Sequence, residues 1–379
     1  MGTNWTVAPR TEAPRTFGVE EELLLVDPVG GAPQAISGAV VTYAKRHGVS
    51  LSGDEPLETE FQREQLETAT RPCTSLGELS EQVRQTRLAA DRAARGVGAA
   101  VAALATCPVV VNPSLTPSAR FRRMAHAYAL TADEQLTCGC HVHVHVRSPD
   151  EGVAVLDRIR PWLPPLLALS ANSPFWQGRD TGYDSWRHQV WGRWPSTGPT
   201  ELFGSAKVYR ATVDALLETG ALLDEGMIYF DARLSRHYPT VEIRVADVCL
   251  HADDTVLLAA LIRALVDTAA RAWRAGDPPD AVRTDLLRLA MWRASRSSIR
   301  GDLVHPETRC ATPARTVVEA LRDHVGPALE ASGDLAATDV LLKALLARGN
   351  GAQQQRRVYS QARDATAIVT HAVAQTTTW

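Results

Sequence analysis

Two glutamates with one residue between them give the sequence its first chemical signal. The segment Phe17–Val26 reads FGVEEELLLV, apolar enough to be a buried strand. Because side chains of a strand alternate between its faces, Glu20 and Glu22 share one face and Glu21 lies on the other. Buried carboxylates must be paired, protonated or bound to a cation, and oxygen ligands suit Mg²⁺ or Mn²⁺ better than zinc. An edge strand with solvated glutamates would explain this segment equally well.

Three histidines lie on one face of a second predicted strand. Gln135–Val146 reads QLTCGCHVHVHV, the clearest alternation in the chain, and it places His141, His143 and His145 on the same face. A single histidine would more often be structural, whereas three beside an apolar reverse face indicate a function. A neutral imidazole can bind a divalent metal or form a hydrogen bond with phosphate.

Two further segments repeat the combination of a polar face with a more apolar one. In Thr240–Val248, TVEIRVADV, Glu242 and Arg244 share a face, although a simple salt bridge would also explain that pair. Leu57–Thr70, LETEFQREQLETAT, is predicted as one strand. Its alternation would place Glu60, Gln62 and Glu64 on one face and Gln65, Glu67 and Ala69 on the other.

A long polar and aromatic stretch, Asn172–Pro199, contains further cationic side chains. Loops of this length inside a compact chain are usually functional or disordered, and the tryptophans argue against disorder. Arg179, Arg187 and Arg193 could bind carboxylate or phosphate groups. Packing of these arginines on tryptophan rings is the alternative.

Strands and helices in this order predict how the candidate residues are positioned. Ser75 and Glu78 fit a capping box that opens a helix reaching Leu104. We also expect a short buried strand at Pro108–Val111 and a last helix from Gln353 to Ala374. Further helices are predicted at 118–127, 201–222, 254–275, 281–297, 313–331 and 336–346. The segment 153–170 is also predicted to be helical, but broken by Pro161, Pro164 and Pro165. The fold class is therefore α+β: an antiparallel sheet with a polar, metal-binding inner face and helices packed outside.

Composition excludes several classes of protein. The chain of 379 residues has a net charge of −3 with its basic residues dispersed, so neither a nucleic-acid partner nor a membrane partner is expected. The six cysteines form no CxxC pair, and with no secretory signal we expect a cytoplasmic protein. Cys138 and Cys140 would lie on the apolar face, away from the histidines.

Residues 1–15 are expected to be a flexible tail and residues 16–379 one catalytic domain. No P-loop or Rossmann motif is present.

Four ordered motifs resemble a known family. FGVEEELLLVDP, QLTCGCHVHV, TVEIRVADV and WRASR (292–296) look like those of the carboxylate–amine ligases also called glutamate–cysteine ligase type 2. The resemblance covers the chain from about Phe17 to the C-terminal helices. It implies the catalytic fold of glutamine synthetase, in which an antiparallel sheet forms a funnel. It also implies ATP-dependent joining of a carboxylate, typically the γ-carboxylate of glutamate, to an amine.

The resemblance further implies roles for individual residues. Metal ligands for Mg²⁺ or Mn²⁺ would be Glu20, Glu22, Glu67, His141 and Glu242. The catalytic residues would be Arg244 and Arg233, and those binding ATP or substrate would be Arg187, His143, Asp231 and Arg296.

Two residues depart from the pattern of the family, and three alternatives stay open. Gln354 stands where relatives commonly have a basic residue, and His145 is an additional histidine. The same carboxylates and histidines could serve a metal-dependent hydrolase of an amide or related small molecule, recognised by turnover without ATP. A binding protein without catalysis is the third alternative. The sequence identifies neither the amine nor whether the chain forms a homo-oligomer.

Overall fold

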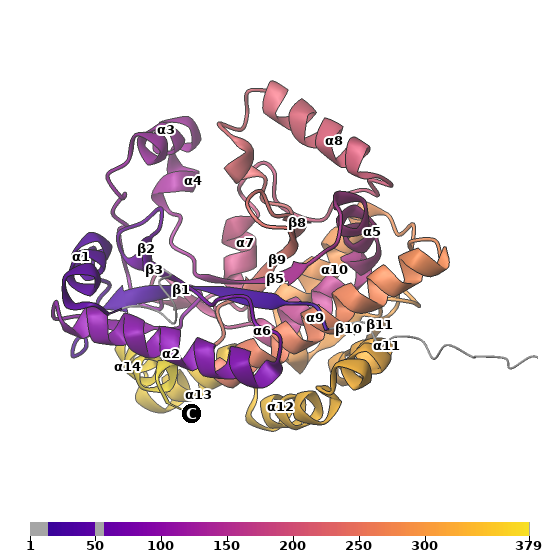
Figure 1. The fold of residues 1–379 in the computed structure, drawn as a ribbon. Coiled ribbons are helices and arrows are strands. Elements are labelled where there is room, and N and C mark those ends of the chain that lie inside the picture. Colours follow the sequence, from indigo (N-terminus) through magenta and orange to yellow (C-terminus); the bar gives the residue numbers. More distant parts are fainter. Residues whose placement is uncertain (1–13, 50–56, 379) are drawn as a thin grey trace, which may run out of the picture.

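An antiparallel sheet is the centre of the structure (Figure 1). The computed structural model describes residues 14–49 and 57–378. Within these residues the main sheet has seven strands in the order β2-β3-β1-β5-β9-β8, and β4 pairs with the C-terminal end of β1. The strands are β1 Phe17–Val26, β2 Glu58–Thr59, β3 Gln65–Ala69, β4 Ala100–Ala102, β5 Gly139–His145, β8 Ala232–Leu234 and β9 Thr240–Asp247.

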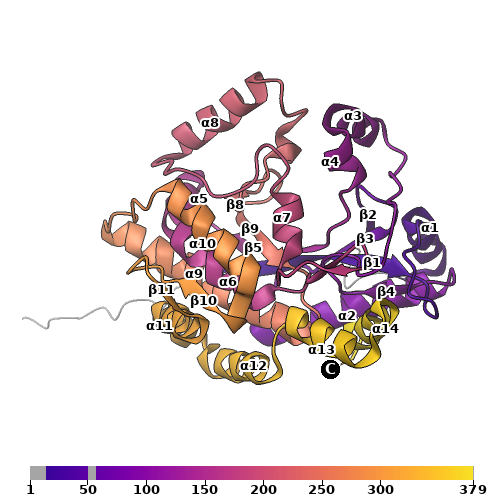
Figure 2. The ribbon, with the colours of Figure 1, turned by 180° about the vertical axis from the view of Figure 1, so that it is seen from behind.

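Helices cover one face of this sheet and leave the other to a cavity. The longest helix, α9, contacts β1 and β5, while α2 also packs on β1 and α6 on β9. Figures 1 and 2 show α2, α6, α9 and the C-terminal helices on one side of the sheet, and α3, α4 and α8 on the other. The predicted α+β class is confirmed. The helices are α1 Ser37–His47, α2 Leu76–Arg95, α3 Ala119–Tyr128, α4 Leu130–Asp133, α5 Pro149–Ile159, α6 Leu163–Ser170, α7 Trp186–Trp191, α8 Ala206–Glu218, α9 Ala252–Ala275, α10 Thr284–Ser297, α11 Ala314–Ser332, α12 Leu335–Arg348, α13 Gly351–Ala362 and α14 Ala365–Thr376.

The apolar face of the sheet forms the main core with these helices. Val142 of β5 and Ile243 of β9 are fully buried there. Glu21 also points to this side, and Arg87 of α2 neutralises it with two hydrogen bonds of 2.6 and 2.8 Å. Cys138 and Cys140 are free and buried, as the alternation predicts. Glu21 therefore lies in the core, on the opposite side of the sheet from Glu20 and Glu22.

The segment predicted as one strand over 57–70 is a hairpin instead. Strands β2 and β3 pair with each other, with Thr59 opposite Leu66, and residues 61–64 form the turn. The amide N–H of Gln65 donates to the carbonyl of Gln62 at 3.2 Å and closes this turn. The turn contains neither glycine nor proline, so the usual sequence signals of a turn are absent.

Several predicted boundaries also differ from the structure, for example that of the helix predicted at 201–222, which is α8 at Ala206–Glu218. The helix that begins after Ser75 ends at Arg95, and the buried strand β4 lies at Ala100–Ala102 and not at Pro108–Val111. The predicted last helix is two helices, because Arg363 adopts a left-handed conformation with φ of 55° between α13 and α14. Two small sheets complete the structure: β6 Phe175–Trp176 with β7 Arg179–Asp180, and β10 Asp302–Val304 with β11 Ala311–Pro313.

The start of the described chain is anchored. The guanidinium of Arg15 donates to both carboxylate oxygens of Glu151, at 2.7 and 3.2 Å, and to Asp267 at 3.3 Å. The predicted flexible tail therefore does not include Arg15, and its residues 1–13 lie outside the described residues. No described helix combines the length and apolarity that are needed to cross a bilayer.

Candidate active site

A cavity of about 410 Å³ lies over the polar face of the sheet. Its floor is made of side chains from β1, β3, β5 and β9, and its walls come from α3, α7 and the segment that follows α8. Strand register brings the floor together. Glu20 of β1 pairs with His141 of β5, and Glu22 of β1 pairs with Glu67 of β3. Residues far apart in the sequence therefore meet on one surface.

The first group of potential metal ligands is Glu20, His141 and Glu242. Each residue offers one donor atom, and the three atoms lie within 4.8 Å of one another. Burial, followed by the charge of Arg244, lowers the pKa of His141 to about 4, so its ring is neutral and has a lone pair available. Burial raises the pKa of Glu20, but hydrogen bonds from His141 and His143 outweigh it and hold that pKa well below its usual value.

The second group consists of three carboxylates, Glu22, Glu60 and Glu67, whose donor oxygens also lie within 4.8 Å of one another. Burial and then the charge of Glu60 raise the pKa of Glu22 to about 7. Burial and a hydrogen bond with Glu60 raise the pKa of Glu67 well above its usual value. Carboxylates held this close together repel one another unless a proton or a cation joins them. An oxygen-only group of this kind fits a hard divalent cation.

Glu60 is the residue that the sequence analysis missed. A continuous strand would separate Glu60 and Glu67 onto opposite faces, as predicted. The hairpin turn at 61–64 reverses the chain and brings both into the cavity. The only signal in the sequence is that another glutamate, Glu58, lies two residues before Glu60.

Two arginines hold Glu242 at the edge of the first group. Arg233 of β8 donates to its carboxylate at 2.8 and 3.2 Å, and Arg244 forms a second ion pair with it. Burial raises the pKa of Glu242, but the charges of Arg244 and Arg233 outweigh it and lower that pKa strongly. Nε of Arg244 has no hydrogen-bond partner among the described residues. Both guanidinium groups line the cavity, where an anion on the metals would meet them.

The three histidines of β5 do not share one environment. His143 lines the cavity, with Nε2 3.2 Å from Glu20 and Nδ1 3.0 Å from the hydroxyl of Thr240. His145 is outside the cavity lining, and its backbone carbonyl accepts a hydrogen bond of 2.9 Å from Arg15. The additional histidine therefore lies at the end of the strand that is anchored to the N-terminal segment.

Arg187 lies beneath the floor and does not line the cavity. Its guanidinium carbon is 5.8 Å from the centre of the Trp191 ring, and Nη1 is 3.8 Å from Asp247. A Cβ atom at Gly139 would collide with Nη2 of Arg187, so the glycine leaves the space that this side chain fills. The arrangement matches the packing alternative, although the positive charge of Arg187 still offsets part of the rise in the pKa of Glu22 that burial and Glu60 cause.

Asp231 is absent from the residues that line the cavity, and its binding of substrate stays a prediction. Its side chain lies in a separate small cavity beside Arg160 and Gly198, and burial raises its pKa to about 7. Strand β8 begins only at Ala232, so alternation from Arg233 does not extend back to Asp231. What Asp231 contributes to the site is its backbone carbonyl, which accepts from the N–H of Arg244 at 2.9 Å.

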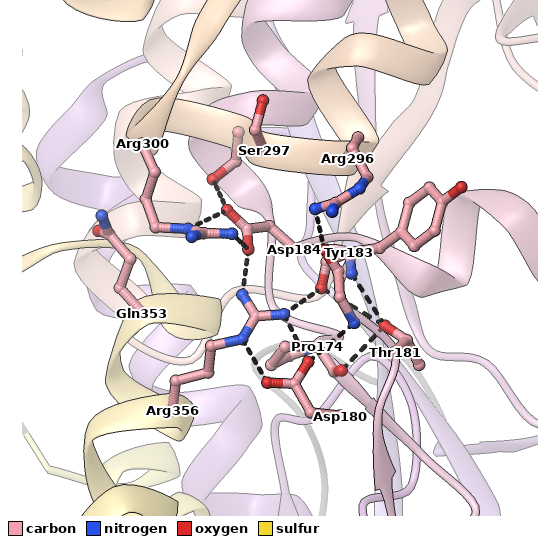
Figure 3. Close-up of polar contacts among 12 residues, drawn as sticks. Pro174, Asp180, Thr181, Tyr183, Asp184, Arg296, Ser297, Arg300, Gln353 and Arg356 are labelled. Carbon is pink, nitrogen blue, oxygen red and sulfur yellow. Dashed lines mark hydrogen bonds and ion pairs between the residues drawn. The ribbon is translucent and has the colours of Figure 1, made fainter.

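Arg296 also lies outside the cavity lining. Its guanidinium carbon is 5.3 Å from the centre of the Tyr183 ring, and the guanidinium donates a hydrogen bond to the carbonyl of Gly182. Figure 3 shows Arg296 beside Tyr183. In the same view the buried carboxylate of Asp184 joins Arg300 of η3 (Ser298–Arg300) to Arg356 of α13. These ion pairs connect the loop before α7 to η3 and to α13. The nearby Gln354 is buried and bonds His251 at 2.9 Å, so the departure from the family pattern occurs in a helix contact.

Aromatic rings form part of the lining of the cavity. Phe61 contacts Phe121 and Trp194 edge to face, with ring centres 5.3 and 6.2 Å apart. Trp194 in turn contacts Tyr229, and Tyr229 contacts Trp191, at 5.7 and 4.7 Å. All five rings line the cavity. The cavity therefore has one continuous aromatic region in its lining.

Comparisons with known proteins show what this chain is similar to. A relative from Streptomyces avermitilis, with the provisional name glutamate–cysteine ligase 2-1, is 53% identical over 96% of this chain and 99% of its own length. A relative of similar provisional name from Streptomyces coelicolor is 52% identical over 96% of this chain and 99% of its own length.

Two solved structures share the fold. The glutamate–cysteine ligase of Francisella tularensis, in complex with AMP, superposes with a TM-score of 0.68 at 13% identity, over 97% of this chain and 90% of that one. A bifunctional glutathione synthetase from Pasteurella multocida gives a TM-score of 0.68 at 15% identity, over 96% of this chain and 52% of that one. The family model described as glutamate-cysteine ligase family 2 (GCS2) matches residues 16–372. The chain therefore belongs to the glutamate–cysteine ligase family 2.

Proposed function

We propose that this chain is an ATP-dependent carboxylate–amine ligase of the glutamate–cysteine type, acting on the γ-carboxylate of glutamate. The proposal rests on how the side chains on the floor of the cavity are arranged. Two groups of metal-type ligands lie side by side, and Arg244 and Arg233 stand at the edge of one of them. Family membership and the fold of glutamate–cysteine ligases support it.

The donor atoms fit divalent cations of the magnesium type. One group is made of carboxylates alone and the other of two carboxylates and one imidazole, without cysteine. Glu20, His141 and Glu242 would hold one ion, and Glu22, Glu60 and Glu67 another. Bound there, Mg²⁺ or Mn²⁺ would neutralise and orient the phosphates of ATP.

The residues of the chain would act on the phosphates and on the leaving group. A carboxylate does not react with an amine unless it is activated, and transfer of the γ-phosphoryl group from ATP to glutamate produces an acyl phosphate and ADP. Arg244 lines the cavity, and its guanidinium would stabilise the charge that develops on the transferred group. Arg233 keeps Glu242 ionised and oriented.

The second half of the reaction needs a positioned amine. The amine nitrogen forms a bond to the γ-carbonyl carbon as the carbon–oxygen bond to phosphate breaks. Phosphate leaves, and the proton of the amine passes to solvent.

The test is ADP release with ATP, Mg²⁺ and glutamate, with hydroxylamine as a small general acceptor. The proposal predicts ADP and γ-glutamyl hydroxamate in equal amounts, both dependent on glutamate. Consumption of an amide without ADP release would instead identify a metal-dependent hydrolase. Failure to form either product under all metal conditions would refute catalysis at this site.

A further inference from the structure

Glu20, a candidate metal ligand, lies against a histidine that is outside its own ligand group. The first group takes its donor atoms from Glu20, His141 and Glu242, and does not include His143. The ring of His143 lies beside the carboxylate of Glu20, with Nε2 3.2 Å from Oε1, whereas Nδ1 of His141 lies 3.5 Å from Oε2. The two oxygens of Glu20 therefore face different rings, and the orientation of this carboxylate depends on the position of the His143 ring.

The other ring nitrogen of His143 contacts a hydroxyl group. Nδ1 lies 3.0 Å from Oγ1 of Thr240, the first residue of β9. Because Nε2 faces an ionised carboxylate, which only accepts hydrogen bonds, Nε2 is the nitrogen that carries the hydrogen in a neutral ring. A hydroxyl can donate to Nδ1 in that neutral ring and accept from it in a charged one. Thr240 therefore holds the ring in either state, and the methyl group of a valine could do neither.

The backbone around Thr240 gives this hydroxyl a fixed position. The N–H of Thr240 donates to the carbonyl of Tyr238 at 2.7 Å, and its carbonyl accepts from the N–H of Ser235 at 2.9 Å. Thr240 lies two residues before Glu242, which pairs with His143 across β5 and β9. Thr240 and Glu242 thus share a face of the sheet, one diagonal to His143 and the other opposite it. The branched Cβ of threonine further restricts its rotamers.

We infer that Thr240 is a positioning residue for the metal ion of the first group: its hydroxyl orients His143, and His143 orients the carboxylate of Glu20 toward that ion. Removal of an outer partner of this kind typically lowers metal affinity by about 10- to 100-fold. The inference rests on the proposed function only through the ion assigned to Glu20, His141 and Glu242. It does not depend on the reaction or on the identity of the substrates.

Thr240→Val and Thr240→Ser are the matched pair that tests this role. Valine keeps the shape of threonine without the hydroxyl, and serine keeps the hydroxyl without the methyl group. Mn²⁺ binding is measured in the absence of ATP and glutamate. Nitrogen modulation of the electron spin echo of bound Mn²⁺ identifies the group that contains His141, because the second group has only oxygen donors.

We expect Thr240→Val to weaken Mn²⁺ binding at the nitrogen-coordinated site by about tenfold or more and to leave the oxygen-only site unchanged. Thr240→Ser should keep the wild-type affinity at both sites. Thr59→Val is the control at the other edge of the sheet, because it removes a hydroxyl from the cavity lining on β2, and it should also leave both affinities unchanged.

Four results would overturn the inference. Wild-type Mn²⁺ affinity in Thr240→Val would show that the hydroxyl does not act on the ion, and a raised KM for ATP in that case would make His143 a substrate-binding residue. Equal weakening in Thr240→Ser would assign the effect to the methyl group. Equal weakening at both sites, or in Thr59→Val, would indicate a general disturbance of the sheet.

The Mn²⁺ measurement and the hydroxamate assay separate this inference from the function on which it rests. The expected loss of Mn²⁺ affinity in a protein that forms neither ADP nor hydroxamate would refute the ligase function and support the role of Thr240. Hydroxamate formation combined with wild-type Mn²⁺ affinity in Thr240→Val would support the ligase function and refute the role of Thr240.

Discussion

Replacement of Glu22 by glutamine should stabilise the metal-free protein. The pKa of Glu22 is raised in the folded state from 4.5 to about 7, first by burial and then by the charge of Glu60. Ionisation of this group therefore opposes folding: the cost is absent below pH 4.5, grows as the pH rises, and is complete above pH 7. At 1.36 kcal/mol per pH unit, this difference in pKa corresponds to about 3 kcal/mol at pH 8.

Glu22→Gln removes the charge while its amide oxygen can still accept from the N–H of Gly139, which now lies 2.6 Å from the carboxylate. For a chain of 379 residues, about 3 kcal/mol corresponds to a rise in melting temperature of about 3 to 4 °C. The assay is thermal unfolding at pH 8 in a chelating buffer. The gain should shrink toward pH 5, where the wild-type carboxylate is protonated as well. Added Mg²⁺ should stabilise wild type more than the variant.

The neighbouring residue supplies the matched control. Glu21 points to the other face and is buried in an ion pair with Arg87, and it also accepts from Thr255 at 2.7 Å. Glu21→Gln leaves a buried guanidinium without its counter-charge and should lower stability by about 3 to 5 kcal/mol. Identical chemical changes one residue apart are thus expected to have opposite signs. A lower melting temperature for Glu22→Gln at pH 8 without metal would refute the electrostatic account of the floor.

Three further predictions concern the site and its surroundings. Arg244→Lys should lower the rate of ADP formation by roughly two to four orders of magnitude with metal binding retained, because lysine lacks the planar fork of donors; near-normal turnover would make Arg244 a structural partner of Glu242. Serine at both Cys138 and Cys140 should lower the melting temperature without a selective loss of turnover, since polar hydroxyls would replace buried thiols; selective loss of turnover at full stability would reverse the face assignment. Asp231→Asn should stabilise the protein at pH 8 and less at pH 6, because burial raises the pKa of Asp231 to about 7 and ionisation above that pH opposes folding. ADP formation should persist in this last variant, and its loss would return Asp231 to the substrate site.

The alternation of side chains along each predicted strand was enough to predict which residues form the floor of the cavity. The strand Phe17–Val26 has the predicted bounds, and its faces divide Glu20 and Glu22 from Glu21 as predicted. The same rule placed His141 on the cavity side and Cys140 in the core. These predictions hold because the side chains of a strand alternate with a period of two whatever the tertiary structure. Family motifs then supplied Glu67 and Glu242, both of which line the cavity.

Tertiary structure decided the features that depend on chain reversal and on contacts between distant segments. Glu60 joined the carboxylates only because residues 61–64 turn without glycine or proline, which periodicity cannot detect. Arg187 and Arg296 belong to motifs or loops that look functional, yet packing on Trp191 and Tyr183 holds them outside the cavity lining. The pairing of Arg120 with Asp224 joins residues 104 positions apart in the chain. Such contacts depend on how helices and loops pack over the sheet, and the sequence pattern of either segment alone contains no trace of its partner.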